Sequence, residues 1–249
     1  IKDDCGVLNF TATDSTASDP NNPSLSSRKT HVWLWIGRSF LCCGIGRILM
    51  HGSIYLDASN SSTREAWLIQ NMPGILLASS IILIVLWFAL VQLAARGTSS
   101  DIVLSLSLAL ICAGCTTMMA GYIKGGASAL PLATVLLMSA VVPPFWFSRR
   151  VDSDKRFNRH AIGTAAIGVG LVSLFSLLWI GRFFGQLTSI DAIVMFLAPS
   201  LCWITELPSI RKRSATLKVA IRLILVIVPL AILLAHAKRE FDEKMAPLL

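Results

Sequence analysis

Long apolar blocks separated by short polar links make up most of the chain after residue 72. Each block holds about 20 residues, the length that a helix needs to cross a bilayer core of roughly 30 Å. Because the links are short, consecutive helices are expected to run antiparallel as neighbours in a bundle. The pattern predicts an all-α polytopic helical membrane bundle with six clear spans, at about residues 73–95, 101–123, 129–147, 161–180, 189–207 and 216–237.

A further apolar stretch at residues 32–56 leaves the predicted number of spans at six or seven. It contains Arg38 and Arg47, whose spacing of nine residues places them on opposite faces of a straight helix. A central arginine costs roughly 2.5–3.5 kcal/mol on insertion, and each Leu, Ile or Phe returns only a few tenths of that. The alternatives are a marginal crossing and a helix lying in the membrane interface. Since no clean polar face is found, the pattern favours the crossing.

The first 30 residues have a different composition, seen in the segment TATDSTASDPNNPSLSS. A chain rich in Ser, Thr, Asp, Asn and Pro buries too little apolar surface to form a core. The sequence therefore predicts a disordered polar tail at residues 1–30, followed by a transmembrane helical domain at residues 31–249.

Residue types at the expected ends of the spans predict where the helices begin and bend. Pro73 opens the first clear span at a position where proline is tolerated. Ser100 and Asp101 are expected to cap the second. Asp191 opens the fifth span and suits the positive end of a helix dipole. Pro199 lies inside that span, where proline removes a helix hydrogen bond and often produces a kink.

Composition supports the membrane class and removes one class of partner. The 249 residues are 54% hydrophobic and 14% charged, with a mean hydropathy of +0.68, whereas soluble domains carry about 25% charged residues. The formal net charge is +8. In a membrane protein such an excess gathers in cytoplasmic loops and faces anionic lipid. We therefore expect the lipid bilayer as partner, with anionic lipid at the basic loops 148–160 and 209–213, and no nucleic acid.

The distribution of Lys and Arg predicts the orientation. The loop at residues 148–160 holds five of them, and the sequence RKR follows the fifth clear span, two crossings later on the same side. The opposite-side links next to these two loops hold only Lys124 and Arg182. The loops 148–160 and 208–215 are therefore predicted to be cytoplasmic, although basic residues in the C-terminal tail oppose this count. The expected location is the cell (inner) membrane.

Five charged residues inside or beside the spans are candidate binding residues. Glu206 lies near the cytoplasmic end of the fifth span, and Lys218 and Arg222 lie one turn apart near the start of the sixth. Because these spans run antiparallel, the three side chains are expected at similar depth. This predicts a contact of Glu206 with Arg222 or with Lys218, which would be structural. Arg38 and Arg47 complete the set.

The motif CAGC places Cys112 and Cys115 in the middle of the second clear span. A redox pair is usually found at a helix N-terminus, where the dipole stabilises a thiolate. Deep in a span, the small residues of this motif favour close helix packing over redox chemistry. The pair Ala166 and Gly170 in the fourth span also predicts close helix packing. The four histidines lack metal-ligand spacing, so no metal and no cofactor is predicted.

Function is constrained mainly by the scarcity of ionisable groups within the spans. Ion pathways and pumps usually need a chain of such groups, and the sequence contains no recognisable catalytic motif. The sequence therefore favours a non-catalytic membrane subunit or scaffold of a larger complex over an enzyme. The alternative is a small-solute transporter or permease-like protein. The prolines at 199 and 229 are consistent with this alternative, because interrupted helices often frame the binding sites of transporters.

Overall fold

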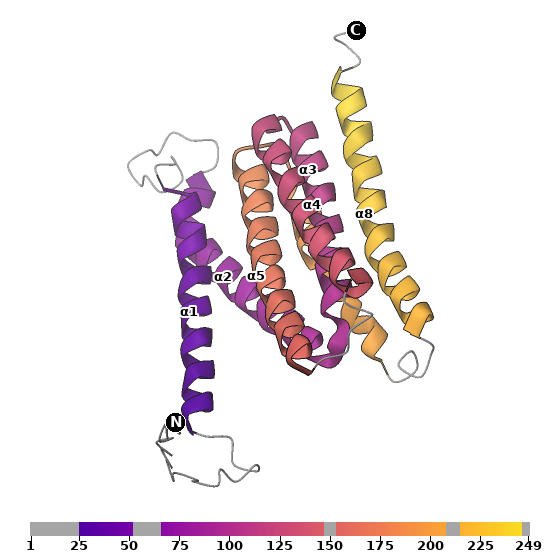
Figure 1. The fold of residues 1–249 in the computed structure, drawn as a ribbon. Coiled ribbons are helices and arrows are strands. Elements are labelled where there is room, and N and C mark those ends of the chain that lie inside the picture. The colour runs from indigo at the N-terminus through magenta and orange to yellow at the C-terminus, as the bar shows by residue number, and fades with distance from the viewer. Residues whose placement is uncertain (1–24, 52–65, 147–152, 208–214, 246–249) are drawn as a thin grey trace, which may run out of the picture. The chain divides into compact units, whose positions relative to one another are not determined.

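The computed structural model describes residues 25–51, 66–146, 153–207 and 215–245 (Figure 1). These residues form helices and turns without a strand, which confirms the all-α prediction. The chain divides into two units within its first helix, at residues 1–38 and 39–249. The helices are α1 (Leu25–Leu49), α2 (Ala66–Leu93), η2 (Ala94–Thr98), α3 (Ser99–Met119), α4 (Ile123–Trp146), α5 (Ser153–Phe183), α6 (Ser189–Leu197), η3 (Ala198–Glu206) and α8 (Ala215–Met245).

Seven segments in the described part of the chain are long and apolar enough to cross a membrane. This confirms the prediction of an integral membrane protein built as a helical bundle. Whether the first segment crosses stays a prediction, since its hydropathy of 1.3 is the lowest of the seven. The segments are Val32–Leu49, Asn71–Arg96, Ser99–Met119, Ile123–Val142, Gly163–Phe183, Ser189–Glu206 and Leu217–Glu243.

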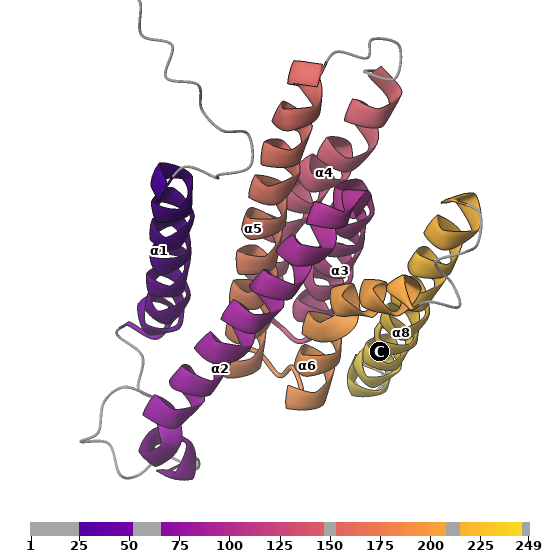
Figure 2. The ribbon, with the colours of Figure 1, turned by 90° about the horizontal axis from the view of Figure 1, so that it is seen from below.

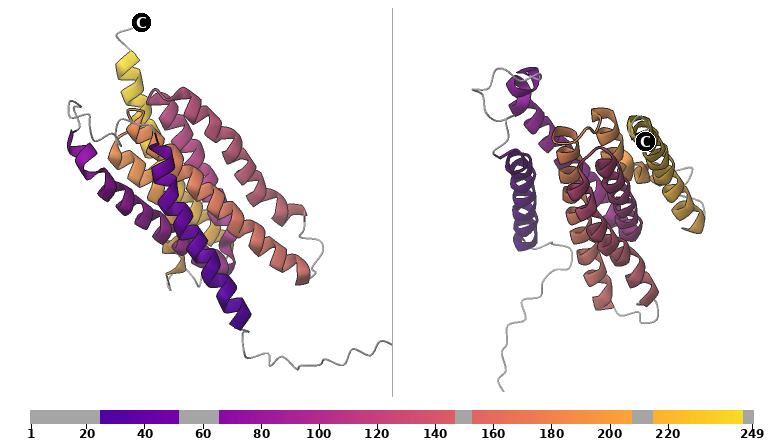
Figure 3. Two further views of the ribbon diagram at one scale, coloured as in Figure 1. Left: turned by 90° about the vertical axis from the view of Figure 1, so that its left-hand side faces the viewer. Right: turned by 90° about the horizontal axis from the view of Figure 1, so that it is seen from above.

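Helix α3 lies at the centre of the second unit, where it contacts α4, α5 and α8 (Figure 1). It buries 67% of its span, and its Leu106 and Leu110 are fully buried. Both views in Figure 3 show α4 and α5 running side by side. Figure 2 shows α2 running obliquely to α5, which it also contacts.

Glycines allow the closest helix contacts. A Cβ atom on Gly126 of α4 would collide with the carbonyl oxygen of Gly114 in α3, and one on Gly114 would lie 3.1 Å from the Gly126 carbonyl oxygen. A Cβ on Gly168 of α5 would lie 2.7 Å from the Trp87 ring of α2. Close backbone approach through small residues is a common way for membrane helices to associate. The packing role predicted for the CAGC segment therefore agrees with the position of Gly114.

Several helix boundaries differ from the prediction because polar residues continue the helices beyond the apolar blocks. Helix α1 begins at Leu25, within the predicted polar tail, and residues 1–24 lie outside the described part. Helix α2 begins at Ala66, so Pro73 lies inside the helix. Residues 153–160, predicted as loop, form the first turns of α5. The chain stays helical from α2 through the π-helical segment η2 into α3. Ser100 and Asp101 therefore lie in the first turn of α3 instead of capping it.

The segment Ser189–Glu206 consists of two kinds of helix. Thr188 caps α6, since its Oγ1 accepts a hydrogen bond from the Asp191 backbone N–H at 3.2 Å. The same hydroxyl donates to Asp191 Oδ2 at 2.6 Å, so Asp191 opens the helix as predicted. From Ala198 the chain tightens into a 3₁₀-helix, with Pro199 in its first turn. This 3₁₀ segment has nine residues, which is unusual, since 3₁₀ runs longer than about four residues are uncommon.

Candidate functional site

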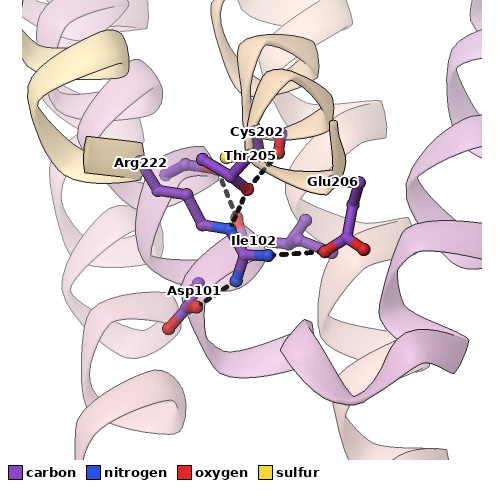
Figure 4. Close-up of polar contacts among 7 residues, drawn as sticks. Asp101, Ile102, Cys202, Thr205, Glu206 and Arg222 are labelled. Atoms are coloured by element: carbon purple, nitrogen blue, oxygen red, sulfur yellow. Dashed lines mark hydrogen bonds and ion pairs between the residues drawn. The ribbon is translucent and has the colours of Figure 1, made fainter. Parts of the chain in front are cut away.

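A buried arginine on α8 joins three helical segments (Figure 4). Arg222 donates from Nη1 to Asp101 Oδ2 at 2.6 Å, and Asp101 lies in the first turn of α3. It donates from Nη2 to Glu206 Oε1 at 2.8 Å and from Nε to Thr205 Oγ1 at 2.6 Å, both in η3. The Thr205 hydroxyl in turn donates to the Cys202 carbonyl oxygen at 2.8 Å. We call Arg222, Asp101, Glu206 and Thr205 the arginine cluster.

The electrostatics of the arginine cluster follow from its burial. The Arg222 side chain is 5% exposed, against 23% for Asp101 and 15% for Glu206. A guanidinium presents several N–H groups in a rigid plane, which lets one side chain bind two carboxylates at once. A second cation, Arg96 of η2, lies 4.0 Å from Glu206 and is 53% exposed. Among the described residues, two acidic and two basic side chains are thus linked by ion pairs.

Arg96 also connects the π-helical segment to the 3₁₀ segment. Its guanidinium lies 5.2 Å from the ring centroid of Trp203 in η3, a cation–π distance. The Trp203 indole N–H donates to the carbonyl oxygen of Ala89 in α2 at 3.3 Å. The two helical segments that depart from α geometry therefore meet at the arginine cluster.

The structure brings some of the predicted residues together and separates others. The predicted contact between Glu206 and Arg222 is confirmed. Lys218, although one turn away, forms no ion pair among the described residues. Arg38 lies over the Trp35 ring at 4.8 Å, within the first unit, and Arg47 is exposed two residues before the end of α1. None of these three joins the arginine cluster.

Asp101, Thr205 and Arg96 were missed as members of the site. Asp101 was interpreted only as a helix cap, and the short hydroxyl side chain of Thr205 gave no charge signal. The order of the spans does contain the relevant information, because the second clear span starts at the end of the bundle where the fifth one stops. Listing the charged residues expected at that end of the bundle would have grouped Asp101 and Arg96 with Glu206.

The cysteines of the CAGC motif lie in the packed interior. The Cys112 thiol is buried and donates to the Leu230 carbonyl oxygen of α8 at 3.4 Å. Cys115 is partly exposed, and both thiols are free. Across the described residues, no group of three or more His, Cys, Asp or Glu side chains is placed to hold a metal ion. Cys112 therefore contributes to the contact between α3 and α8.

A second feature is an apolar groove with a volume of about 400 Å³. It lies within the spans, and its lining includes only three polar side chains, Ser79, Arg182 and Ser189. Its apolar lining comes from α2, α5 and α6: Ile75, Ile82, Phe175, Leu178, Trp179, Phe183, Ala192, Ile193, Phe196 and Leu197. This arrangement suits a hydrocarbon occupant and not a charged solute.

The chain has no match among known protein families, curated proteins or solved structures.

Proposed function

We propose that this protein is a non-catalytic integral membrane subunit or scaffold, whose arginine cluster holds α3, η3 and α8 in a fixed arrangement. The observation that supports this most strongly is the pairing of Arg222. Its guanidinium is occupied by two carboxylates and a hydroxyl of the same chain. Charges compensated in this way stabilise a particular arrangement of helices and leave little capacity for binding a charged substrate.

The apolar character of the groove supports the same proposal. A route for ions or protons through a membrane needs polar or ionisable side chains along its length. The roughly 400 Å³ groove is lined mainly by apolar side chains. Helix α8 buries only 17% of its span within its own chain. Its Ile224, Val228 and Ile232 are exposed at a spacing that places them on one face, and this face is available to lipid or to another membrane protein.

Isolation in a mild detergent tests the proposal. We expect the protein to be recovered with a partner in fixed stoichiometry, so that the particle contains more protein than one 27.0 kDa chain. Val228→Trp on the exposed face of α8 should lower the recovery of a partner that binds there, and Val85→Trp on the exposed face of α2 is the matched control. Recovery as a single, monodisperse chain from freshly solubilised native membranes would contradict the proposal.

A small-solute transporter is the second candidate, and one observation favours it. The π-helical η2 and the 3₁₀-helical η3 meet at the arginine cluster, and interrupted helices often frame the binding sites of transporters. In that case the arginine cluster would open and close during transport. Flux of a solute into liposomes containing the purified protein, lost in Arg222→Met and kept in Lys218→Met, would establish this candidate over the first.

We further propose that the loops 148–160 and 208–215 face the cytoplasm, in the cell (inner) membrane. Their Lys and Arg content supports this orientation, because short basic loops are retained on the cytoplasmic side. The basic residues at 148–160 and 209–213 would then lie beside anionic lipid headgroups.

A further inference from the structure

The groove between α2, α5 and α6 has a buried floor and an exposed rim. Phe175, Leu178 and Trp179 of α5 are at most 9% exposed and form its floor. Ile82 of α2 and Ile193 of α6 form opposite edges and are 50% and 57% exposed. The three helices can be followed in Figure 2. The groove is therefore a recess in the lateral surface of the second unit, open between α2 and α6.

The position of the groove within the spans indicates what fills it. Its lining residues belong to the segments Asn71–Arg96, Gly163–Phe183 and Ser189–Glu206. The nine residues from Ser189 to Leu197 on α6 are separated by eight helical steps, which extend about 12 Å, and half of a bilayer core measures about 15 Å. The groove thus extends through most of one leaflet. Hydrocarbon, and not water, surrounds the protein at that depth.

A cation lies at the mouth of the groove. Arg182 is one residue from the end of its span, so we expect it near the level of the lipid phosphates. Its Nε donates to Ser189 Oγ at 2.7 Å, which holds the guanidinium at the turn between α5 and α6. In the part of the chain that the structure describes, no carboxylate lies within ion-pair distance of Arg182. Unlike Arg222, it therefore keeps N–H groups available for an anionic partner.

We propose that this groove binds one membrane phospholipid, with an acyl chain along the apolar floor and the phosphate on Arg182. Phosphate oxygens accept charge-assisted hydrogen bonds from a guanidinium, often in pairs. The single cation at the interface end of an apolar recess matches a molecule with one anionic end and a long apolar remainder. This lipid site is independent of whether the chain also has protein partners.

Photo-crosslinking tests the proposal. The purified protein is reconstituted into phosphatidylcholine vesicles that contain a trace of phosphatidylglycerol with a diazirine on its acyl chain. After illumination, the labelled peptides are identified and quantified by mass spectrometry. We expect the label to concentrate on the groove residues of α5 and α6, above the level found on the exposed face of α8.

Four variants separate the contribution of the apolar groove to lipid binding from that of the Arg182 charge. Ala192→Trp fills the groove from α6, and Ile82→Trp narrows it from α2; each should reduce groove labelling about tenfold, which corresponds to about 1.4 kcal/mol. Arg182→Gln should reduce it several-fold, because the phosphate loses its cation. Ser189→Ala should reduce it less than Arg182→Gln does, since it removes the Arg182–Ser189 hydrogen bond but keeps the charge.

Controls make each outcome decisive. Ala231→Trp adds the same bulk to an exposed position on α8 and should leave groove labelling unchanged. The buried thiols of Cys112 and Cys202 should stay protected from maleimide in every variant that is compared, which shows that it is folded. Labelling spread evenly over all exposed faces would mean bulk lipid contact only and would overturn the proposal. Unchanged labelling in Ala192→Trp and Ile82→Trp would overturn it as well.

Discussion

Replacing Arg222 by methionine should lower the free energy of unfolding by about 3 kcal/mol. Removing one partner of a buried ion pair costs roughly 3–5 kcal/mol, because the other charge stays buried without compensation. The three hydrogen bonds of Arg222 alone would account for less, roughly 2 kcal/mol, at about 0.6 kcal/mol for each bond between membrane helices. Asp101 and Glu206 retain some exposure, 23% and 15%. We therefore place the expected loss near the lower end of the range.

The assay is unfolding by SDS in mixed micelles, followed by the fluorescence of the seven tryptophans. Lys218→Met is the matched control, because Lys218 lies one turn before Arg222 on α8 and forms no ion pair among the described residues. Its effect should be within about 0.5 kcal/mol. Combining Arg222→Met with Asp101→Asn and Glu206→Gln should recover at least about 1 kcal/mol of the loss, since no unpaired charge then remains buried.

Two results would refute this reasoning. Equal stability of Arg222→Met and Lys218→Met would show that the arginine cluster contributes no more than a half-buried lysine without an ion pair among the described residues. A triple variant no more stable than Arg222→Met would show that the loss came from the packing of the arginine side chain and not from unpaired carboxylates. The two outcomes are distinguishable because they concern different pairs of variants.

Three further predictions concern packing, capping and orientation. Gly126→Ala should cost about 1–3 kcal/mol in the SDS assay, because its Cβ would collide with the α3 backbone; Gly74→Ala, with open space around its Cβ, should be neutral or stabilising by up to about 1 kcal/mol. Thr188→Ala should cost about 1 kcal/mol through loss of the α6 cap, and an effect near zero would mean that α6 does not depend on this cap. With the native cysteines replaced, an impermeant maleimide added to intact cells should label Lys124→Cys and not Ser148→Cys, and the reverse pattern would invert the proposed orientation.

The apolar pattern located the spans well but placed their ends poorly. The requirement for a bilayer-length apolar block determines where a span lies, and the predicted and observed spans overlap in every case. The ends depend on residues outside the hydrocarbon, where continuing a helix costs a few tenths of a kcal/mol per residue or less for most side chains. Helix α2 thus begins at Ala66, upstream of Pro73, which had suggested a start.

The arginine cluster was predictable in part, for a physical reason. Antiparallel neighbours bring charges of similar depth together, so the contact of Glu206 with Arg222 followed from the order of the spans. Asp101 was assigned to a cap, on the assumption that α3 starts a new helix. The π-helical η2 instead keeps the chain helical into α3, so the Asp101 side chain is available to Arg222. A short π-helical segment such as η2 cannot be detected from hydropathy alone.

Arg222 and Arg182 differ in what surrounds them, and this difference determines their roles. Arg222 is 5% exposed and is bound by two carboxylates of its own chain, so its charge stabilises the fold. Arg182 lies beside an apolar groove and is bound by a neutral hydroxyl, so its charge remains uncompensated among the described residues. A cation at the edge of a membrane is stabilised either by acids of the protein or by phosphates of the lipid. Among the described residues, Arg222 has two acids beside it and Arg182 has none. This difference is the physical basis for assigning a structural role to the arginine cluster and a lipid to the groove.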